Sequence, residues 1–111
     1  MNPCNFFKCL ADDARLKLLL LISEVGEACV CDLVSALDID QPKTSRNLAK
    51  LRESQILQGE RKGKWMFYRL HPELPDWAKN VIRETADKNH RYLGESLSHL
   101  VCCRQNRAHN C

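Results

Sequence analysis

The stretch GEACVCDLVSALDIDQPKTSRNLAKLRESQIL, residues 26–57, decides the fold of this chain. In its first half, apolar residues recur at the i, i+3, i+4, i+7 spacing of a one-sided helix. Residues 38–40 then turn the chain, and Pro42 suits the first turn of a second helix, whose inward face holds Leu48 and Leu51. Two short amphipathic helices joined by a tight polar turn are typical of a helix-turn-helix.

The second helix of such a motif enters the major groove of double-stranded DNA. Side chains near its N-terminus must reach base edges, while longer cations nearby suit phosphates. The outward positions of this helix are polar or basic. We therefore predict base contacts from Gln41, Thr44, Ser45, Arg46 and Asn47, and phosphate contacts from Lys43 and Lys50.

A β-hairpin is predicted directly after this motif, in the segment LQGERKGKWMFYRLH, residues 57–71. Its side chains alternate along two short runs, and residues 62–64 supply the turn. The tip carries Arg61, Lys62 and Lys64, which could lie along the DNA backbone or in the minor groove. A helix-turn-helix followed by a basic hairpin is typical of a winged helix. We expect the hairpin's aromatic residues to pack on the core rather than stack on single strands.

The charge of the chain is distributed unevenly. Residues 41–69 hold eight basic and two acidic residues, whereas the whole chain of 111 residues has a net charge of only +3. A basic block on an otherwise acidic chain favours a polyanionic partner. The length fits one domain, which we place at residues 1–101, followed by a cysteine-containing tail at residues 102–111.

A long helical pattern follows Pro72 and Pro75 and extends over residues 76–101. Such a helix is longer than a small core needs, so its remaining apolar surface predicts a partner. Gly94 or residues 88–90 could kink it. With two helices predicted before Gly26, the fold class is α+β, mainly α: a winged helix-turn-helix with a two-stranded β-hairpin wing and a long C-terminal dimerisation helix.

Several function classes are disfavoured by the sequence. The longest apolar run, residues 18–22, is far too short to span a membrane, and no export signal is visible, so we expect a cytoplasmic protein. No hydrolase, protease or nucleotide-binding motif occurs, and no cysteine lies in a recognisable catalytic loop, so we expect neither an enzyme nor a permanently bound cofactor. Seven cysteines, an odd number, exclude a complete disulfide framework and favour metal, metalloid or redox roles.

Three strings together carry a family resemblance: FKCLADDARLKLLLLISEVGEACVCDL, ALDIDQPKTSRNLAKLRESQIL and RKGKWMFYRLHPELPDWA. They resemble the arsenical-resistance repressors of the ArsR/SmtB family over residues 7–84. The resemblance implies a homodimeric winged-helix repressor. Such a repressor binds the operator of an arsenic-resistance operon and dissociates when a trivalent metalloid binds its cysteines.

The CVCDL box of that family places metalloid thiolates at Cys29 and Cys31. The family's usual third cysteine is replaced by Val34, which leaves a two-thiolate site. Residues i and i+2 of an α-helix lie about 200° apart. If both cysteines are helical, binding must therefore unwind or tilt the helix start, which would be a switch. Packing of both thiols in the core is the alternative.

A second candidate site is the vicinal pair Cys102 and Cys103 near the C-terminus, with His99 and His109 close in sequence. Incidental thiols on a frayed tail, or a zinc or cadmium site, are alternatives there. The CVCDL box favours inorganic As(III) and Sb(III) as inducers, whereas a two-thiolate site would suit methylarsenite. A redox-sensing repressor, released from DNA by peroxide, remains a further alternative.

Overall fold

The computed structural model of the chain describes the backbone of residues 1–110 and the side chains of residues 1–103. Predictions for Cys111 and for the His109 side chain lie outside the described residues. Within the described part, no helix combines the length and the apolar character needed to cross a bilayer. The elements are α1 (Pro3–Leu10), α2 (Asp13–Val25), β1 (Glu27–Cys29), α3 (Val30–Leu37), α4 (Gln41–Glu53), β2 (Leu57–Lys62), β3 (Trp65–Leu70), α5 (Asp76–Lys88) and α6 (His90–Asn110).

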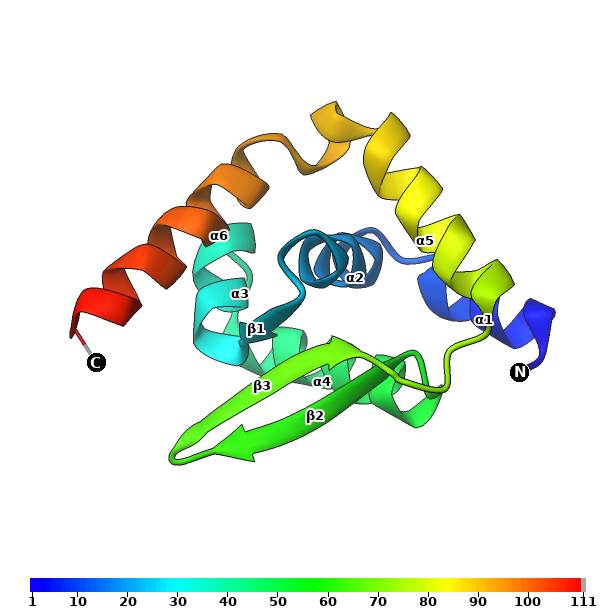
Figure 1. Cartoon of the computed structure of the whole chain (residues 1–111), viewed down its shortest axis with the longest axis horizontal. Coiled ribbons are helices and arrows are strands. Elements are labelled where there is room, and N and C mark those ends of the chain that lie inside the picture. The colour runs from blue at the N-terminus through cyan, green and yellow to red at the C-terminus, as the bar shows by residue number, and fades with distance from the viewer. Residues whose placement is uncertain (111) are drawn as a thin grey trace.

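Helix α2 forms the centre of the core and is surrounded by the other helices and the sheet (Figure 1). Its residues 18–22 are completely buried, which follows from five consecutive aliphatic side chains. The Asp12 side chain caps the helix by accepting a hydrogen bond from the Arg15 amide at 2.9 Å. Gly26 ends it with a φ of 89°, a conformation that favours glycine. The predicted buried helix ending at Gly26 is confirmed.

Helices α3 and α4 form the predicted helix-turn-helix. Asp38 adopts the left-handed conformation at the end of α3, and the chain then turns into α4. The side chain of Asp40 accepts a hydrogen bond from the Lys43 amide at 2.8 Å and so caps the start of α4. Leu48 and Leu51 are fully buried, which fixes α4 against the core by its inner face.

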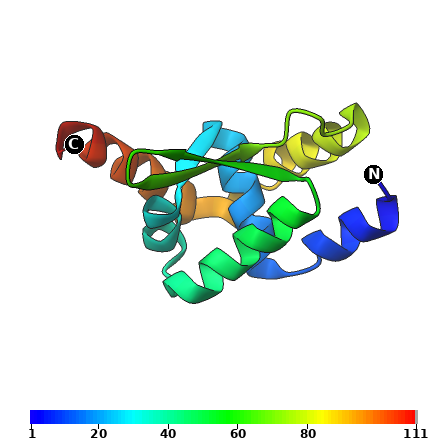
Figure 2. The same cartoon turned by 90° about the horizontal axis from the view of Figure 1, so that it is seen from below.

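The hairpin is confirmed, with β2 and β3 paired in register from Leu57 with Leu70 to Lys62 with Trp65. Viewed from below, the hairpin and α4 both lie on the side nearest the viewer (Figure 2). A third strand, β1, pairs with β3 and makes the sheet order β1-β3-β2. The prediction of a two-stranded hairpin therefore missed β1, which connects the hairpin to the start of α3.

The predicted single helix over residues 76–101 is wrong, because α5 ends at Lys88 and α6 begins at His90. Asn89 separates the two helices, and its side-chain amide donates to the Thr85 carbonyl at 2.8 Å. Within α6, Gly94 has the non-helical dihedrals φ 44° and ψ −122°. Both breaks fall where the sequence predicted a kink. The two helices form an arch over α2, and α6 continues past residue 101, where the sequence placed a domain boundary (Figure 1).

Candidate nucleic-acid interface and thiol sites

The outer face of α4 is polar, basic and exposed. It combines hydrogen-bonding side chains that suit base edges with cations that suit phosphates. The N-terminus of α4 adds the positive end of its helix dipole. The predicted contact residues that this face exposes are Gln41, Lys43, Ser45, Arg46 and Lys50.

Thr44 and Asn47 lie on the inner face of α4, so their predicted outward placement is wrong. Thr44 is 0% exposed, and its hydroxyl donates to the Asp40 carbonyl at 3.0 Å. Asn47 is 6% exposed, and its Oδ1 accepts a hydrogen bond from Nη1 of Arg15 at 3.2 Å. The two residues thus hold α4 in place rather than present groups to a ligand.

Arg15 is a positioning residue that the sequence did not single out. Its Nε donates to the carbonyl of Cys9 at 2.5 Å, and its Nη1 donates to Asn47. One guanidinium therefore ties α1, α2 and α4 together, which sets the angle at which α4 faces solvent. The sequence contains little indication of this role, because Arg15 is a single arginine shortly before the apolar residues 18–22 of α2.

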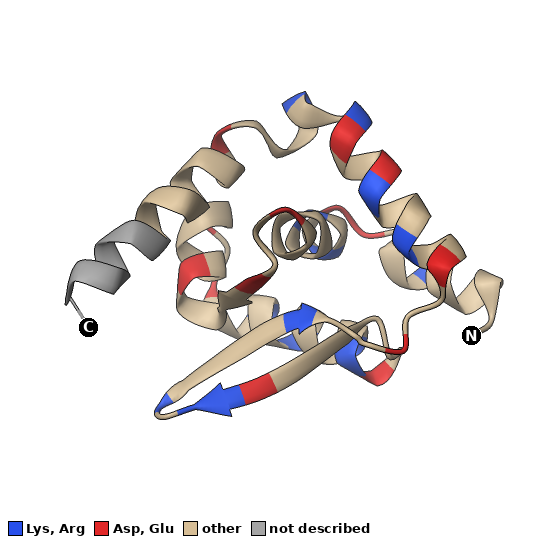
Figure 3. Ribbon diagram, viewed as in Figure 1, with Lys and Arg blue, Asp and Glu red and all other residues tan. Residues whose placement is uncertain are grey.

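The tip of the wing exposes the three predicted cations Arg61, Lys62 and Lys64. Figure 3 shows basic residues at the hairpin tip, with an acidic position behind them on β2. Lys62 is engaged, because its Nζ lies 2.7 Å from Oε1 of Glu27 on β1. A phosphate that binds Lys62 must therefore compete with this carboxylate.

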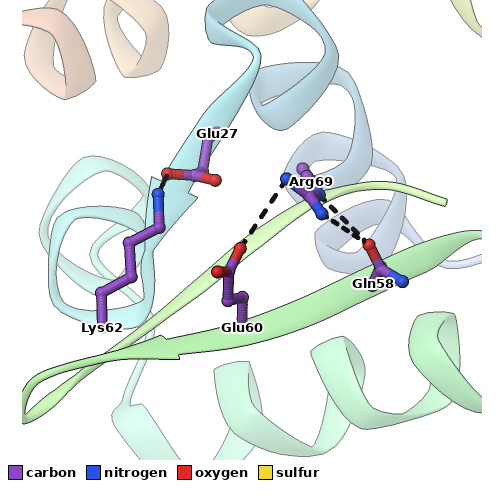
Figure 4. A network of polar contacts seen from close by, with 5 residues as sticks. All are labelled: Glu27, Gln58, Glu60, Lys62 and Arg69. Atoms are coloured by element: carbon purple, nitrogen blue, oxygen red, sulfur yellow. Dashed lines mark hydrogen bonds and ion pairs between the residues drawn. The ribbon is translucent and has the colours of Figure 1, made fainter. Parts of the chain in front are cut away.

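The base of the wing carries a second polar network (Figure 4). The Arg69 guanidinium donates to Oε1 of Gln58 at 2.9 and 3.2 Å and lies 3.7 Å from a carboxylate oxygen of Glu60. This arginine is thus occupied by neighbours on its own hairpin. The available positive charge of the wing is consequently concentrated at its tip.

An open groove connects the wing with the start of both helices of the helix-turn-helix. It brings together predicted DNA contacts from two elements, Gln41 and Ser45 from α4 and Lys64 from the wing. It also includes Cys31, a predicted metalloid ligand. The residues that line the groove are Val30, Cys31, Gln41, Ser45, Lys64, Trp65, Met66 and Tyr68.

Cys29 and Cys31 differ in conformation and in burial. Cys29 ends β1, pairs with Phe67, and has the extended dihedrals φ −90° and ψ 159°. It is completely buried, whereas Cys31 lies in the first turn of α3 and is exposed. The premise that both thiols are helical is therefore wrong. The core packing considered for this pair applies to Cys29 alone.

Cys102 and Cys103 lie on α6 rather than on a separate tail. Cys102 is exposed, whereas Cys103 is half-buried against α3. The Sγ of Cys103 lies 3.4 Å from the hydroxyl of Ser35, and Nε2 of His99 lies 3.1 Å from the same oxygen. Adjacent helical residues diverge by about 100°, so the two thiols point to different sides of α6.

A preformed site with three ligands is absent from the described part of the chain. There, no three His, Cys, Asp or Glu side chains are grouped closely enough to hold a metal ion. Two-thiolate chemistry is therefore the arrangement to consider among these residues.

A tyrosine–aspartate pair fastens α6 to α2. The Tyr92 hydroxyl donates to Oδ1 of Asp13 at 2.5 Å, and Lys17 lies 3.3 Å from the same carboxylate. This hydrogen bond, followed by the contact with Lys17, lowers the pKa of Asp13. Burial, followed by the hydrogen bond to Asp13, raises the pKa of Tyr92. The contact therefore favours an ionised Asp13 beside a neutral Tyr92.

Comparison with known proteins identifies relatives of this arrangement. The family model described as "Bacterial regulatory protein, arsR family" matches residues 12–58. The arsenic resistance transcriptional regulator ArsR1 of Pseudomonas putida is 50% identical over 101 residues, which cover 91% of this chain and 79% of the relative. The arsenical resistance operon repressor of Escherichia coli is 56% identical over 82 residues, covering 74% and 70%. The crystal structure of the transcriptional repressor BigR from Xylella fastidiosa superimposes with a TM-score of 0.66 at 33% identity, covering 76% and 79%.

Proposed function

The chain belongs to the arsR family of bacterial regulatory proteins, and we propose that it binds the operator of an arsenic-resistance operon and dissociates when a trivalent metalloid binds its thiolates. The relatives named above are transcriptional regulators and repressors, not enzymes. The observation that carries the proposal is the position of Cys31, in one groove with Gln41 and Ser45 of α4 and Lys64 of the wing. A ligand-binding thiol and the DNA-facing side chains thus share one surface.

Recognition of double-stranded DNA is supported by the exposed face of α4 and the basic tip of the wing. In this proposal, Arg46, Ser45 and Gln41 read base edges in the major groove, and Lys43 and Lys50 contact phosphates. Arg61, Lys62 and Lys64 contact the flanking backbone or minor groove. Thr44 and Asn47 are excluded from this set because they are buried. The protein then acts in the cytoplasm, where its operator lies.

A homodimer is supported by aromatic surface on α1 and α5. Phe7 is 51% exposed and Trp77 is 38% exposed, and their ring centroids lie 6.5 Å apart. Buried Phe6 supports both from beneath, with ring centroids 5.2 Å from Phe7 and 5.1 Å from Trp77. A second copy of the chain would cover this apolar surface. A symmetric dimer would bind an inverted repeat whose half-sites lie about one helical turn apart.

The inducer is proposed to be a trivalent arsenic or antimony species, because thiolates prefer soft, thiophilic ions. Arsenite and antimonite can take up to three thiolates, whereas methylarsenite keeps one bond to carbon and takes two. The described residues offer no group of three ligands. Methylarsenite therefore belongs among the inducers to be tested beside the inorganic ions.

The test is fluorescence anisotropy of a labelled inverted-repeat operator, titrated first with protein and then with arsenite, antimonite or methylarsenite under reducing conditions. We expect saturable binding, followed by release with each trivalent species and no release with zinc. Failure of all three species to release the DNA would contradict the proposal. Release by peroxide without arsenic, reversed by reductant, would favour the redox-sensing alternative. Release by arsenite but not by methylarsenite would contradict the two-thiolate site.

A further inference from the structure

The contact between α3 and α6 holds Cys103 against Ser35, a residue of α3 that is far from it in the sequence. Ser35 of α3 lies at its centre, with its hydroxyl 3.1 Å from Nε2 of His99 and 3.4 Å from Sγ of Cys103. His99 and Cys103 are four residues apart on α6, so they share one face of that helix. That face is turned toward α3.

The two helices run in opposite directions across this contact. Asp38 and Asp40, which follow the end of α3, line one groove with Glu95 and Ser96 from the early part of α6. In Figure 1, α6 passes beside the end of α3, and its later part continues outward beyond that helix. Cys103 therefore lies on the side of Ser35 that faces the N-terminus of α3.

Cys31 occupies that side. It precedes Ser35 by four residues, which places the two side chains about 40° apart on one face, with Cβ atoms about 5–6 Å apart. Cys103 contacts Ser35 directly, so Cys31 and Cys103 are both neighbours of the same α3 residue. Cys31 is exposed and Cys103 is half-buried, so both can be reached.

We propose that the inducer bridges Cys31 of α3 and Cys103 of α6, rather than the sequence-adjacent pairs Cys29/Cys31 or Cys102/Cys103. This inference rests on the proposed function and specifies its ligand site. Cys29 is completely buried in the core at the end of β1. Cys102 diverges from Cys103 by about 100° on the helix. This leaves Cys31 and Cys103, the two cysteines that neighbour Ser35 on α3 and α6.

The bridging reaction is a ligand exchange without oxidation or reduction. Methylarsenite, CH₃As(OH)₂, exchanges its two As–O bonds for two As–S bonds, and each departing hydroxide takes one thiol proton to form water. Arsenite reacts in the same way and keeps one hydroxyl group. Arsenic stays trivalent throughout, so no oxidant or reductant is required.

A bridge at this position would act on DNA binding through α3. Cys31 lines the groove that contains Gln41 and Lys64, and α3 leads into α4 through the left-handed turn at Asp38. Drawing the start of α3 toward α6 would move this side of the groove relative to α4 and the wing. An ion that binds the bridged arrangement more tightly than the DNA-binding arrangement shifts the population away from DNA.

The test uses methylarsenite as the probe and mass spectrometry as the readout. Trypsin cleavage would place Cys29 and Cys31 in residues 18–43, and Cys102 and Cys103 in residues 92–104. We expect the intact protein to gain one CH₃As group with the loss of two hydrogens, and the two peptides to be joined by it. The join should persist in a Cys29→Ala/Cys102→Ser variant, which retains only the proposed pair among these four thiols.

Single substitutions then separate the candidate pairs in the operator-release titration. We expect Cys31→Ser and Cys103→Ser each to require at least about tenfold more methylarsenite for release, because the second thiolate raises the effective affinity. Cys102→Ser is the matched control on α6 and should respond as the wild type does. If Cys29→Ala disturbs folding, assessed by circular dichroism, Cys102→Ser alone serves for the peptide mapping, with fragmentation to locate the modified cysteine.

The outcomes distinguish this inference from the function on which it rests. Arsenic confined to one peptide, or release that needs Cys102 but not Cys31, would overturn the bridge while leaving a metalloid-responsive repressor. A bridged wild-type protein that stays on the operator would instead contradict the proposed function and leave the bridge intact.

Discussion

The two helices of the helix-turn-helix expose different chemistry. The outer face of α4 is polar and basic, with Arg46, Lys43 and Lys50 exposed. The outer face of α3 carries Cys31 and Ser35, and Ser35 is in contact with α6. These two faces meet at the groove that holds Cys31 and Gln41.

Under the proposed function, this difference corresponds to two separate roles for the two helices. Helix α4 is held by its inner face, through buried Thr44 and Asn47, and its outer face is available to DNA. Helix α3 has a thiol at its start and α6 beside it, and in the proposed function it is the helix that binds the inducer. The proposed function therefore places DNA recognition and inducer binding on two neighbouring helices, which are joined by the turn at Asp38.

The largest effect is expected when the reading face is broken. Arg46→Ala should weaken operator binding by about 1–3 kcal/mol and relax specificity at one base pair, without changing stability, if Arg46 reads a guanine. Anisotropy titrations against the operator and single-base variants measure this. Arg52→Ala, an exposed arginine in the last turn of α4, is the matched control. Equal losses for Arg46 and Arg52 would refute the recognition assignment.

Substitutions on the inner face of α4 should lower the stability of the fold rather than change the DNA sequence that the protein prefers. Asn47→Ala leaves the Arg15 guanidinium without one acceptor and should lower the free energy of unfolding by about 1–3 kcal/mol. Urea denaturation followed by circular dichroism gives this value, with Ser45→Ala as the exposed control on the same helix. If Asn47→Ala is fully stable yet reads a different operator sequence, its assignment as a positioning residue is incorrect.

The sequence contained enough information to place α4 more accurately. Thr44, Leu48 and Leu51 follow the i, i+4, i+7 spacing of one helical face, and Asn47 precedes Leu51 by four residues. The prediction placed Thr44 and Asn47 on the outer face because they are polar, although their spacing indicated the inner face. Both residues are buried. Their partners, the Asp40 carbonyl and Arg15, could not be read from a polarity pattern.

Long-range pairing limited the rest of the prediction. Strand β1 has only three residues, and its partner on β3 is distant in the sequence, as the pairing of Glu27 with Arg69 shows. The two interruptions of the C-terminal helix were easier to predict. Asn89, at the end of α5, and Gly94, within α6, are residue types that often interrupt a helix. The proximity of Cys103 to Ser35 depends on how α6 returns to α3 after these breaks, which no local motif encodes.

A moderate gain of DNA binding is expected when the wing is freed from β1. Glu27→Gln removes the carboxylate that holds Lys62 at 2.7 Å and should strengthen operator binding by up to about 1 kcal/mol, because Lys62 becomes available to a phosphate. Anisotropy titrations over a range of salt concentrations should show a steeper salt dependence. Glu24→Gln, an exposed glutamate on α2, controls for the change in net charge. Weaker binding by Glu27→Gln would contradict this assignment of Lys62.

The smallest effect is expected at the contact that fixes α6 from the side of α2. Tyr92→Phe should lower the thermal unfolding midpoint by a few degrees near neutral pH, because it removes the hydrogen bond to Asp13. The pKa of Asp13 is lowered in the folded state, so this contribution is present above its unfolded value of 3.8 and is lost as pH falls. Thermal melts at about pH 7 and about pH 3 should therefore show a difference between the proteins that narrows in acid. A difference that is independent of pH would show that the ionised carboxylate plays no part.

The most direct test of the central claim compares Cys31→Ser with the wild type in one operator titration, first without and then with methylarsenite. Separate reading and sensing helices predict that Cys31→Ser binds operator with wild-type affinity and stays bound at methylarsenite concentrations that release the wild type. Release of Cys31→Ser at the wild-type concentration would contradict the assignment of sensing to α3. Loss of operator binding before any arsenical is added would show that Cys31 belongs to the reading surface instead.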